Sequence, residues 1–257
     1  MIGIIIKDDK RYDYTENYFK NMGHHFVDNS APLNEIDFII FPFKNQVDIT
    51  IYNNSYFSAL KKDVLIFSGI KNDYLALKCA EYNLKYFVMM DVPEIAAKNA
   101  VPTSEGVIAH LISSLTTTIA NSKILIIGYG ICGSDLAKRL KNLDAEVFTL
   151  VRNKQKESLA KNDNIIPIYI NNFFNQKYNA IINTVPSNVI TDDMIIKTNG
   201  TLMLDIASSP YGFNMNLAKS LNPKSALLPA LPGKYAVKTS GEILAEYIEN
   251  ILRRKLK

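Results

Sequence analysis

A glycine-rich turn directly follows a short aliphatic run in the middle of the chain. Residues 123–133 read K-I-L-I-I-G-Y-G-I-C-G, so the run Ile124–Ile127 leads into Gly128, Gly130 and Gly133. In this spacing the first glycine makes a tight turn, the second lets backbone approach a pyrophosphate, and the third lets the next helix pack close to the strand. The pattern predicts a dinucleotide-binding turn. Its alternative is a glycine turn that holds no nucleotide.

The segments around this turn fit a strand–turn–helix–strand unit. The aliphatic run is typical of a strand buried on both faces, residues 134–141 have helical spacing, and residues 146–151 resemble a second strand. Ligands bind beyond the carboxyl ends of parallel strands, so we expect later strand ends to lie beside the same ligand. The predicted cofactor-binding residues are Gly128, Tyr129, Gly130, Ile131, Cys132, Gly133, Arg152, Asn153, Lys154, Thr184, Val185, Pro186 and Ala207.

The residues after the second strand of this unit decide which cofactor is expected. A site for NAD usually has Asp or Glu there, about 20 residues after the first glycine, to hold the ribose hydroxyls. Here the sequence is Val151-Arg152-Asn153-Lys154, with two cations and no acid. Arg can grip a 2′-phosphate with a bidentate fork, so NADP(H) is expected ahead of NAD(H). The alternative is that Arg152 and Lys154 are solvated loop charges.

Two further segments have residue types suited to a carboxylate-bearing substrate. Residues 231–242 place Lys234 and Lys238 before an expected helix start, and residues 102–105 open another expected helix; lysines and helix N-termini both attract anions. We expect the two lysines to bind substrate carboxylates and Glu105 or a bound water to transfer a proton. The predicted substrate-binding set is Thr103, Ser104, Ser208, Lys234 and Thr239. The alternatives are ordinary loop lysines and a Glu105 that only stabilises its helix N-terminus.

Other chemistries find little support in the composition. His24 and His25 are adjacent, and Cys79 and Cys132 fall in expected helices, so neither a metal site nor a disulfide framework is expected. The length of 257 residues fits one large or two small domains, and the net charge of +4 is too mild to imply nucleic acid. The chain has no basic leader and no apolar run long enough for a membrane span, so a cytoplasmic location is expected.

Strands and helices are expected to alternate along the chain, which is typical of an α/β fold with parallel sheets. The expected strands are residues 2–6, 36–43, 64–68, 86–90, 124–127, 146–151, 180–184, 201–206 and 225–228. Helices are expected near residues 14–22, 73–82, 104–120, 134–141 and 241–254, the last with a capping-box pattern at Thr239 and Glu242.

The expected fold class is two Rossmann-like α/β domains with a cleft between them, joined by long helices. Residues 1–100 would form an N-terminal substrate or catalytic domain, completed by a C-terminal helix at 239–257. A linker helix at 101–120 would lead to a dinucleotide-binding domain at 121–238. Residues 102–106 and 231–242 are then expected to face the glycine turn across the cleft.

Six motifs spread over nearly the whole chain resemble those of the A-subunit family of dipicolinate synthase from spore-forming bacteria. They are Asp9-Lys-Arg11, Pro102-Thr-Ser-Glu-Gly106, Gly128–Gly133, Asn183–Pro186, Asp205–Ser208 and Leu231–Leu244. The second and the last of these motifs are long enough to be specific. The chain departs from the family at Ser209, where a lysine is usual, at Val237, where a proline is usual, and in lacking paired glycines at its start.

The resemblance implies an NAD(P)-dependent oxidoreductase acting on a CH–CH group. It would oxidise a dihydrodipicolinate-type intermediate of the lysine pathway to dipicolinate with NADP(H) during sporulation. The resemblance also implies a small dicarboxylate substrate, a second, flavoprotein-like dipicolinate synthase subunit (the B subunit) as partner, and a location in the mother cell; a homo-oligomer is also compatible. Two alternatives stay open: another two-domain dehydrogenase of the 2-hydroxyacid or alanine dehydrogenase type, and a non-catalytic nucleotide-binding subunit.

Overall fold

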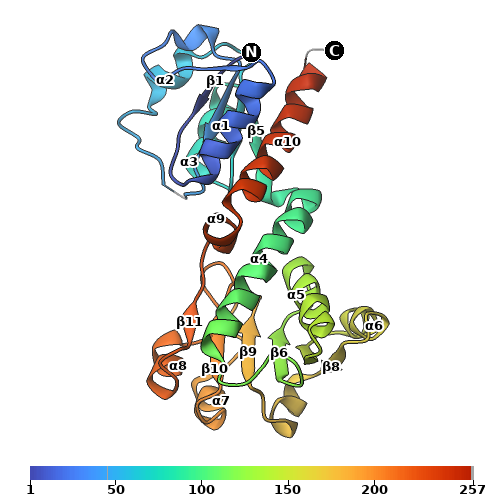
Figure 1. The fold of residues 1–257 in the computed structure, drawn as a ribbon. Helices are drawn as coiled ribbons and strands as arrows, with labels where there is room; N and C mark the ends of the chain where they lie inside the picture. Colours follow the sequence, from blue (N-terminus) through green and yellow to red (C-terminus); the bar gives the residue numbers. More distant parts are fainter. Residues whose placement is uncertain (45, 256–257) are drawn as a thin grey trace. The chain divides into compact units, whose positions relative to one another are not determined.

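The computed structural model describes residues 1–44 and 46–255, which fall into two compact units (Figure 1). Unit 1 consists of Met1–Asn99 and Ala236–Lys257, and unit 2 consists of Ala100–Tyr235. Each unit contains one parallel sheet with helices on both faces. The predicted fold class, two Rossmann-like α/β domains with parallel sheets, is confirmed.

Unit 1 is built on a five-stranded sheet with the order β2-β1-β3-β4-β5. Its strands are β1 (Ile2–Ile5), β2 (His25–Phe26), β3 (Phe38–Phe41), β4 (Leu65–Ser68) and β5 (Lys85–Val88). Its helices are α1 (Arg11–Asn21), α2 (Asn54–Ala59), α3 (Asp73–Glu81) and α10 (Val237–Lys255), with short 3₁₀ turns at η1 (Leu33–Glu35) and η2 (Met89–Asp91). Alternate residues of β3 point to opposite faces, so Ile39 packs with α2 and α3 while Ile40 packs with α1 and α10.

Unit 2 is built on a six-stranded parallel sheet with the order β11-β10-β9-β6-β7-β8. Its strands are β6 (Lys123–Ile127), β7 (Glu146–Leu150), β8 (Ile166–Ile168), β9 (Ala180–Asn183), β10 (Leu202–Asp205) and β11 (Ala226–Leu227). Its helical elements are α5 (Ile131–Asn142), α6 (Lys154–Asn162), η3 (Ile170–Asn175), α7 (Asp192–Lys197), α8 (Met215–Leu221) and α9 (Leu231–Tyr235). The strand order reverses direction between β6 and β9, so the end of β6 lies at the switch point where ligands bind in open parallel sheets.

The chain passes between the units within α4 (Pro93–Ser114) and again between α9 and α10. The expected helix from about residue 104 to residue 120 is wrong at both ends. Pro93 occupies the start of the helix, where its missing N–H costs nothing, and Pro102 is carried inside the helix. The helix ends before Thr116-Thr117-Thr118, because β-branched residues propagate a helix poorly.

The start of the C-terminal helix also differs from the expectation. Helix α10 begins at Val237, so Thr239 lies inside its first turn and does not form the expected capping box. The hydroxyl of Ser240 instead donates to the carbonyl of Ala236 at 2.8 Å. The expected end of this helix at residue 257 lies outside the described residues.

Helix α10 packs closely against α1 within unit 1 (Figure 1). Leu244, Ile248 and Leu252 of α10 join Phe19 of α1 in one buried cluster. The hydroxyl of Thr15 donates to the carbonyls of Arg11 and Gly241 at 3.1 and 3.0 Å. The backbones approach so closely at this point that a Cβ atom on Gly241 would lie 2.4 Å from the carbonyl oxygen of Arg11.

This contact predicts that Gly241→Ala destabilises unit 1. Alanine favours a helix over glycine, but here its methyl group must push α1 away, so we expect the free energy of unfolding to fall by about 1–3 kcal/mol. Urea denaturation followed by circular dichroism measures the change. Asn250→Ala, at an exposed position of the same helix, is the control and should stay within about 0.5 kcal/mol of the parent. A Gly241→Ala variant as stable as the parent would contradict the prediction.

Candidate nucleotide-binding site

The glycine turn joins β6 to α5, and two of its glycines are required by the backbone. Gly128 has φ +94°, in the left-handed region that favours glycine. A Cβ atom on Gly133 would lie 2.4 Å from the carbonyl oxygen of Gly128, so only glycine lets α5 approach the strand this closely. A Cβ atom on Gly130 would meet nothing within 4 Å, so its backbone borders open space. This geometry provides the cradle that a pyrophosphate requires at the N-terminus of a helix.

A cavity of about 920 Å³ surrounds this turn within unit 2. It brings together the predicted residues of the turn, the end of β7 and the end of β9. Of the predicted cofactor-binding residues, Asn153, Lys154 and Ala207 do not belong to its lining. The cavity is lined by Ile127, Gly128, Tyr129, Gly130, Ile131, Cys132, Gly133, Leu150, Val151, Arg152, Lys156, Tyr169, Ile170, Thr184, Val185, Pro186, Ser187 and Val189.

Lys156 lines the cavity together with Arg152, although the sequence pattern pointed to Lys154. The side chain of Asn153 accepts a hydrogen bond from the backbone N–H of Lys156 at 2.9 Å and so caps the start of α6. Lys154 is exposed, and Lys156 is half-buried beside the cavity. The cap could have been recognised from the Asn residue before a helical pattern, but only the structure shows that Lys156 lines the cavity.

Tyr169, which the sequence pattern did not predict, lines the cavity and makes a hydrogen bond to an acid outside it. Its hydroxyl donates to Oε2 of Glu157 at 2.7 Å, and Nζ of Lys161 lies 2.5 Å from Oε1 of the same carboxylate. The hydrogen bond from Lys161, and then that from Tyr169, lower the pKa of Glu157. Glu157 is therefore an ionised carboxylate that already has two partners, and it does not line the cavity.

Tyr129 holds the glycine turn to the far end of α6. Its ring lies in the hydrophobic core and is 5% exposed, and its hydroxyl donates to Oδ2 of Asp163 at 2.7 Å. This hydrogen bond is the largest cause that lowers the pKa of Asp163, and Lys138, whose Nζ lies 3.1 Å away, adds to it. Tyr129 therefore supports the shape of the turn through its side chain.

The neighbouring Cys132 is a free thiol whose pKa is raised by burial and by Asp135.

The opposite side of the cavity is held by a buried pair at the ends of β9 and β10. Asn183 and Asp205 are 0% and 1% exposed, and the amide Nδ2 of Asn183 donates to Oδ1 of Asp205 at 2.9 Å. Asp205 also accepts backbone N–H groups of Ala207 and Gly212 at 2.9 and 2.7 Å. Asn183 donates to the carbonyl of Val185 at 2.9 Å and accepts its N–H at 3.1 Å. These bonds fix the loops that follow both strands, which include Val185 of the cavity lining.

The predicted substrate-binding residues are divided between the two units. Thr103 and Ser104 are buried in α4, and Ser208 is exposed in the loop after β10. Lys234 is exposed on α9 of unit 2, whereas Lys238 and Thr239 lie in the first turn of α10 in unit 1. Nζ of Lys238 lies 3.8 Å from Oε1 of Glu242 on the same helix.

Glu105, the predicted proton-transfer residue, is exposed on α4 and has a cationic neighbour. Its Oε1 lies 3.8 Å from Nη1 of Arg139, whose Nε donates to Oδ2 of Asp135 at 2.7 Å. The Glu105 side chain is 57% exposed, so this ion pair is screened by water.

Metal clusters and membrane-spanning helices are both absent from the part of the chain that the structure describes. Within residues 1–44 and 46–255, no group of three or more His, Cys, Asp or Glu side chains is placed to hold a metal ion. Within the same residues, no helix has the length and apolar character needed to cross a membrane.

Comparisons with known proteins agree with this geometry. Residues 97–207 match the family model described as D-isomer specific 2-hydroxyacid dehydrogenase, NAD binding domain, which supports an NAD(P)-dependent oxidoreductase. The A subunit of dipicolinate synthase from Bacillus subtilis (strain 168) is 31% identical over 239 residues, which cover 87% of this chain and 80% of that protein.

Solved structures extend the likeness to the whole fold. The crystal structure of the dipicolinate synthase A chain from Bacillus subtilis has a TM-score of 0.88 at 25% identity and covers 98% of this chain and 95% of its own. That of the A subunit from Bacillus halodurans has a TM-score of 0.87 at 23% identity, with 98% and 97% covered. The chain belongs to the A-subunit family of dipicolinate synthase.

Proposed function

We propose that this chain is the dehydrogenase subunit of a dipicolinate synthase. It oxidises a dihydrodipicolinate-type ring of the lysine pathway to dipicolinate with NADP⁺ during sporulation, in the cytoplasm of the mother cell. Its partner is a second, flavoprotein-like subunit. Family membership supports the substrate class. The observation that carries the proposal is the cavity of about 920 Å³ around the glycine turn, in which the space beside Gly130 is open.

The reaction removes two hydrogens from the ring, one as a hydride and one as a proton. A bound nicotinamide cofactor supplies the hydride acceptor, and formation of the aromatic pyridine ring provides driving force. The residues of the chain orient the two molecules and neutralise charge. In this proposal Lys234 and Lys238 bind the substrate carboxylates, with Thr103, Ser104, Ser208 and Thr239 beside them. Glu105 or a water molecule takes the proton.

NADP is proposed as the cofactor because of the side chains at the end of β7. Arg152 and Lys156 line the same cavity, and no Asp or Glu of the described residues belongs to its lining. A 2′-phosphate placed beyond β7 would meet two cations, whereas the ribose hydroxyls of NAD would lack their usual carboxylate acceptor. Lys156 replaces Lys154 as the proposed second phosphate ligand.

This arrangement predicts a preference for NADPH that depends on Arg152. Arg152→Asp is expected to weaken NADPH binding about ten- to hundredfold without weakening NADH binding, because a charge-assisted hydrogen bond contributes about 1.5–3 kcal/mol. Lys156→Gln should act in the same direction. Fluorescence titration of the pure chain with each reduced cofactor measures both affinities.

Lys154→Gln is the matched control, since Lys154 is exposed and does not line the cavity. It should bind NADPH within about twofold of the parent. Equal affinity of the parent for NADPH and NADH would exclude the NADP assignment, and an equal loss in the Lys154 and Lys156 variants would exclude Lys156 as the ligand.

The substrate assignment predicts that removal of both lysines impairs catalysis but not cofactor binding. Lys234→Ala combined with Lys238→Ala is expected to lower the rate of dipicolinate formation by about tenfold or more, because the carboxylates lose their counter-ions. The ultraviolet absorbance of dipicolinate follows the reaction with freshly generated dihydrodipicolinate, with and without the second subunit. Lys219→Ala, an exposed lysine of α8, is the control.

A normal rate in the double variant would show that these lysines do not bind the substrate. Oxidation by the chain alone would exclude a purely non-catalytic nucleotide-binding role. Turnover of 2-oxoacid or 2-hydroxyacid pairs in preference to dihydrodipicolinate would instead identify the alternative dehydrogenase class.

A further inference from the structure

The strand order of unit 1 marks a second place where a ligand can bind. In the order β2-β1-β3-β4-β5, the chain leaves β1 toward one edge of the sheet and leaves β3 toward the other. In open parallel sheets, ligands bind beyond the carboxyl ends of the strands at such a switch point. The residues that follow these two strands are 6–11 and 42–44. This switch point belongs to unit 1, whereas the glycine turn belongs to unit 2.

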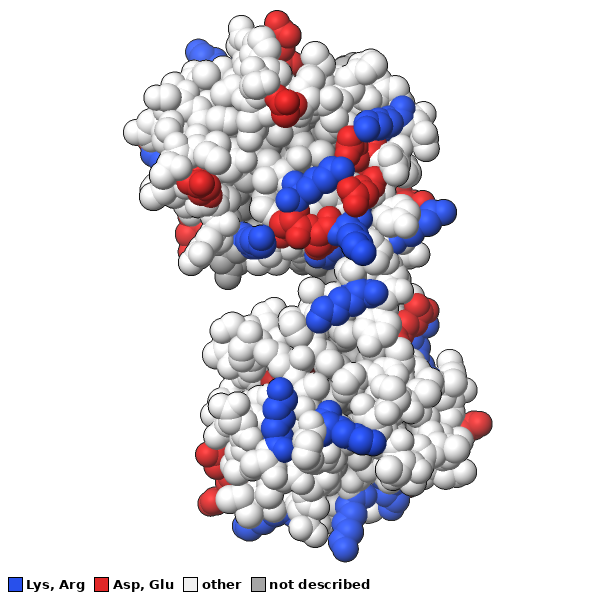
Figure 2. All heavy atoms as spheres, turned by 60° about the vertical axis from the view of Figure 1, so that its left-hand side comes forward, with Lys and Arg blue, Asp and Glu red and all other residues white. Residues whose placement is uncertain are grey.

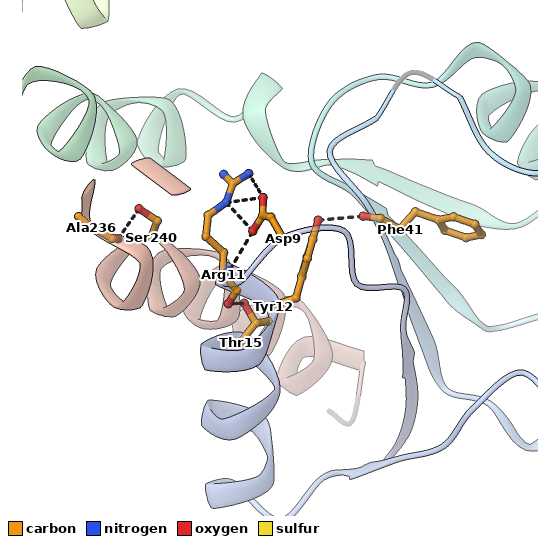
Figure 3. A network of polar contacts seen from close by, with 7 residues as sticks. All are labelled: Asp9, Arg11, Tyr12, Thr15, Phe41, Ala236 and Ser240. Carbon is orange, nitrogen blue, oxygen red and sulfur yellow. Dashed lines mark hydrogen bonds and ion pairs between the residues drawn. The ribbon is translucent and has the colours of Figure 1, made fainter. Parts of the chain in front are cut away.

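Arg11 lies at this switch point, and its guanidinium group is held in a fixed orientation. Nε lies 3.0 and 2.9 Å from the two carboxylate oxygens of Asp9, and Nη2 also donates to Asp9 (Figure 3). The guanidinium carbon lies 4.0 Å from the centre of the Phe43 ring. Gly69 after β4 admits that ring, because a Cβ atom there would lie 2.2 Å from it. Contacts from the loops after three different strands therefore preorganise Arg11, which is 5% exposed.

Two cationic groups at this switch point, Nη1 of Arg11 and Nζ of Lys44, are not engaged by Asp9. Asp9 engages Nε and Nη2 of Arg11, and Nη1 takes no part in that pairing. The exposed Lys44 forms no ion pair with the described residues, and it is close enough to Asp8 to lower the pKa of that carboxyl. Lys7, by contrast, lies 2.7 Å from Asp13 and 2.5 Å from Glu16. Positively and negatively charged side chains lie mixed on one face of unit 1 (Figure 2).

One carboxylate oxygen of Asp8 lacks a donor from another residue. Its Oδ1 is buried and has no hydrogen-bond partner among the described residues. Burial raises the pKa of the Asp8 carboxyl, and the charge of Asp9 raises it further. A ligand that carries an N–H or O–H group would supply a donor for this oxygen.

We propose that the β1/β3 switch point of unit 1 binds a small carboxylic acid with an N–H or O–H group beside its carboxylate. Nη1 of Arg11 and Nζ of Lys44 bind the carboxylate, and Oδ1 of Asp8 accepts the neighbouring hydrogen. Asp9, Phe43 and Gly69 are positioning residues that hold Arg11. The inference rests on the proposed function and deepens it, because a partly reduced pyridine dicarboxylate contains both groups. It makes Arg11 and Lys44 an alternative to Lys234 and Lys238 as the residues that bind a substrate carboxylate.

The competing explanation is that Asp9 and Arg11 only support the start of α1. Asp9 accepts the backbone N–H of Arg11 at 2.8 Å through Oδ1, which is a local structural role. That role accounts neither for the preorganised Nη1 nor for the unpaired oxygen of Asp8. A binding experiment separates the two explanations, since a purely structural clip would not affect the affinity for a free acid.

The test uses calorimetry on the full chain with two probes, piperidine-2,6-dicarboxylate and pyridine-2,6-dicarboxylate. Only the piperidine acid has N–H groups at its ring nitrogen at neutral pH. Arg11→Lys should weaken both acids about tenfold, because lysine can keep the pairing with Asp9 but loses the second arm of the fork. Lys44→Gln should weaken both acids by a smaller factor. Asp8→Asn should weaken the piperidine acid about tenfold and leave the pyridine acid no weaker.

Lys10→Gln is the matched control, since Lys10 is an exposed lysine beside Arg11, and it should change neither affinity. NADPH affinity should be the same in every variant, and thermal unfolding checks that each is folded. The exposed Lys44 gives a readout even if Arg11→Lys unfolds. The proposal is overturned if the parent binds neither acid, or if the Lys44 and Asp8 variants bind both acids as tightly as the parent.

The outcome also separates this site from the proposed function. If the acids bind as described but dihydrodipicolinate is not oxidised, the proposed function fails and the binding site stands. If oxidation is normal and the variants have parental affinities, the function stands and the site assignment is wrong.

Discussion

The nucleotide-binding unit depends on one steric constraint, the close approach of α5 to the end of β6. The carbonyl oxygen of Gly128 occupies the space where a side chain of residue 133 would begin. Because residue 133 has no side chain, the start of the helix comes close to the strand end, and the cavity borders this turn. The positive φ of Gly128 turns the chain sharply enough for this contact. A larger residue at either position would move the helix and remove the cradle.

Two carboxylates elsewhere show different ways of organising the loops beyond a parallel sheet. Asp205 is buried and is satisfied by two backbone N–H groups and the amide of Asn183. Its hydrogen bonds therefore hold the loops after β9 and β10 in place. Asp9 instead pairs with Arg11, which leaves one arm of a guanidinium fork for another acceptor. The first network satisfies its buried carboxylate fully, whereas the second leaves Nη1 of Arg11 outside the pairing with Asp9.

Local sequence was enough to predict the fold class and the glycine turn. The aliphatic run before Gly128, the spacing of the three glycines and the following helical pattern lie within one short segment, so each could be recognised without tertiary information. The absence of an acid after β7 is equally local. The bounds of α4 were wrong because Pro102 was treated as a breaker, whereas the surrounding residues carry the helix through it. Buried packing of Ile95, Val107 and Leu111 on both sides of the proline outweighs the lost hydrogen bond.

Tertiary structure decided which side chains share a site. Lys156, and not Lys154, lines the cavity because the Asn153 cap sets the rotation of the first turn of α6, which the charge pattern alone does not reveal. At the switch point of unit 1, Asp8, Arg11, Phe43 and Gly69 come from loops after three different strands. They meet because the sheet order places β1, β3 and β4 side by side. The sequence by itself determined the parallel strands and the phosphate-binding turn, since these depend on neighbours in the chain. Only the folded sheets decided which distant loop residues share a site, because strand order places those loops beside one another.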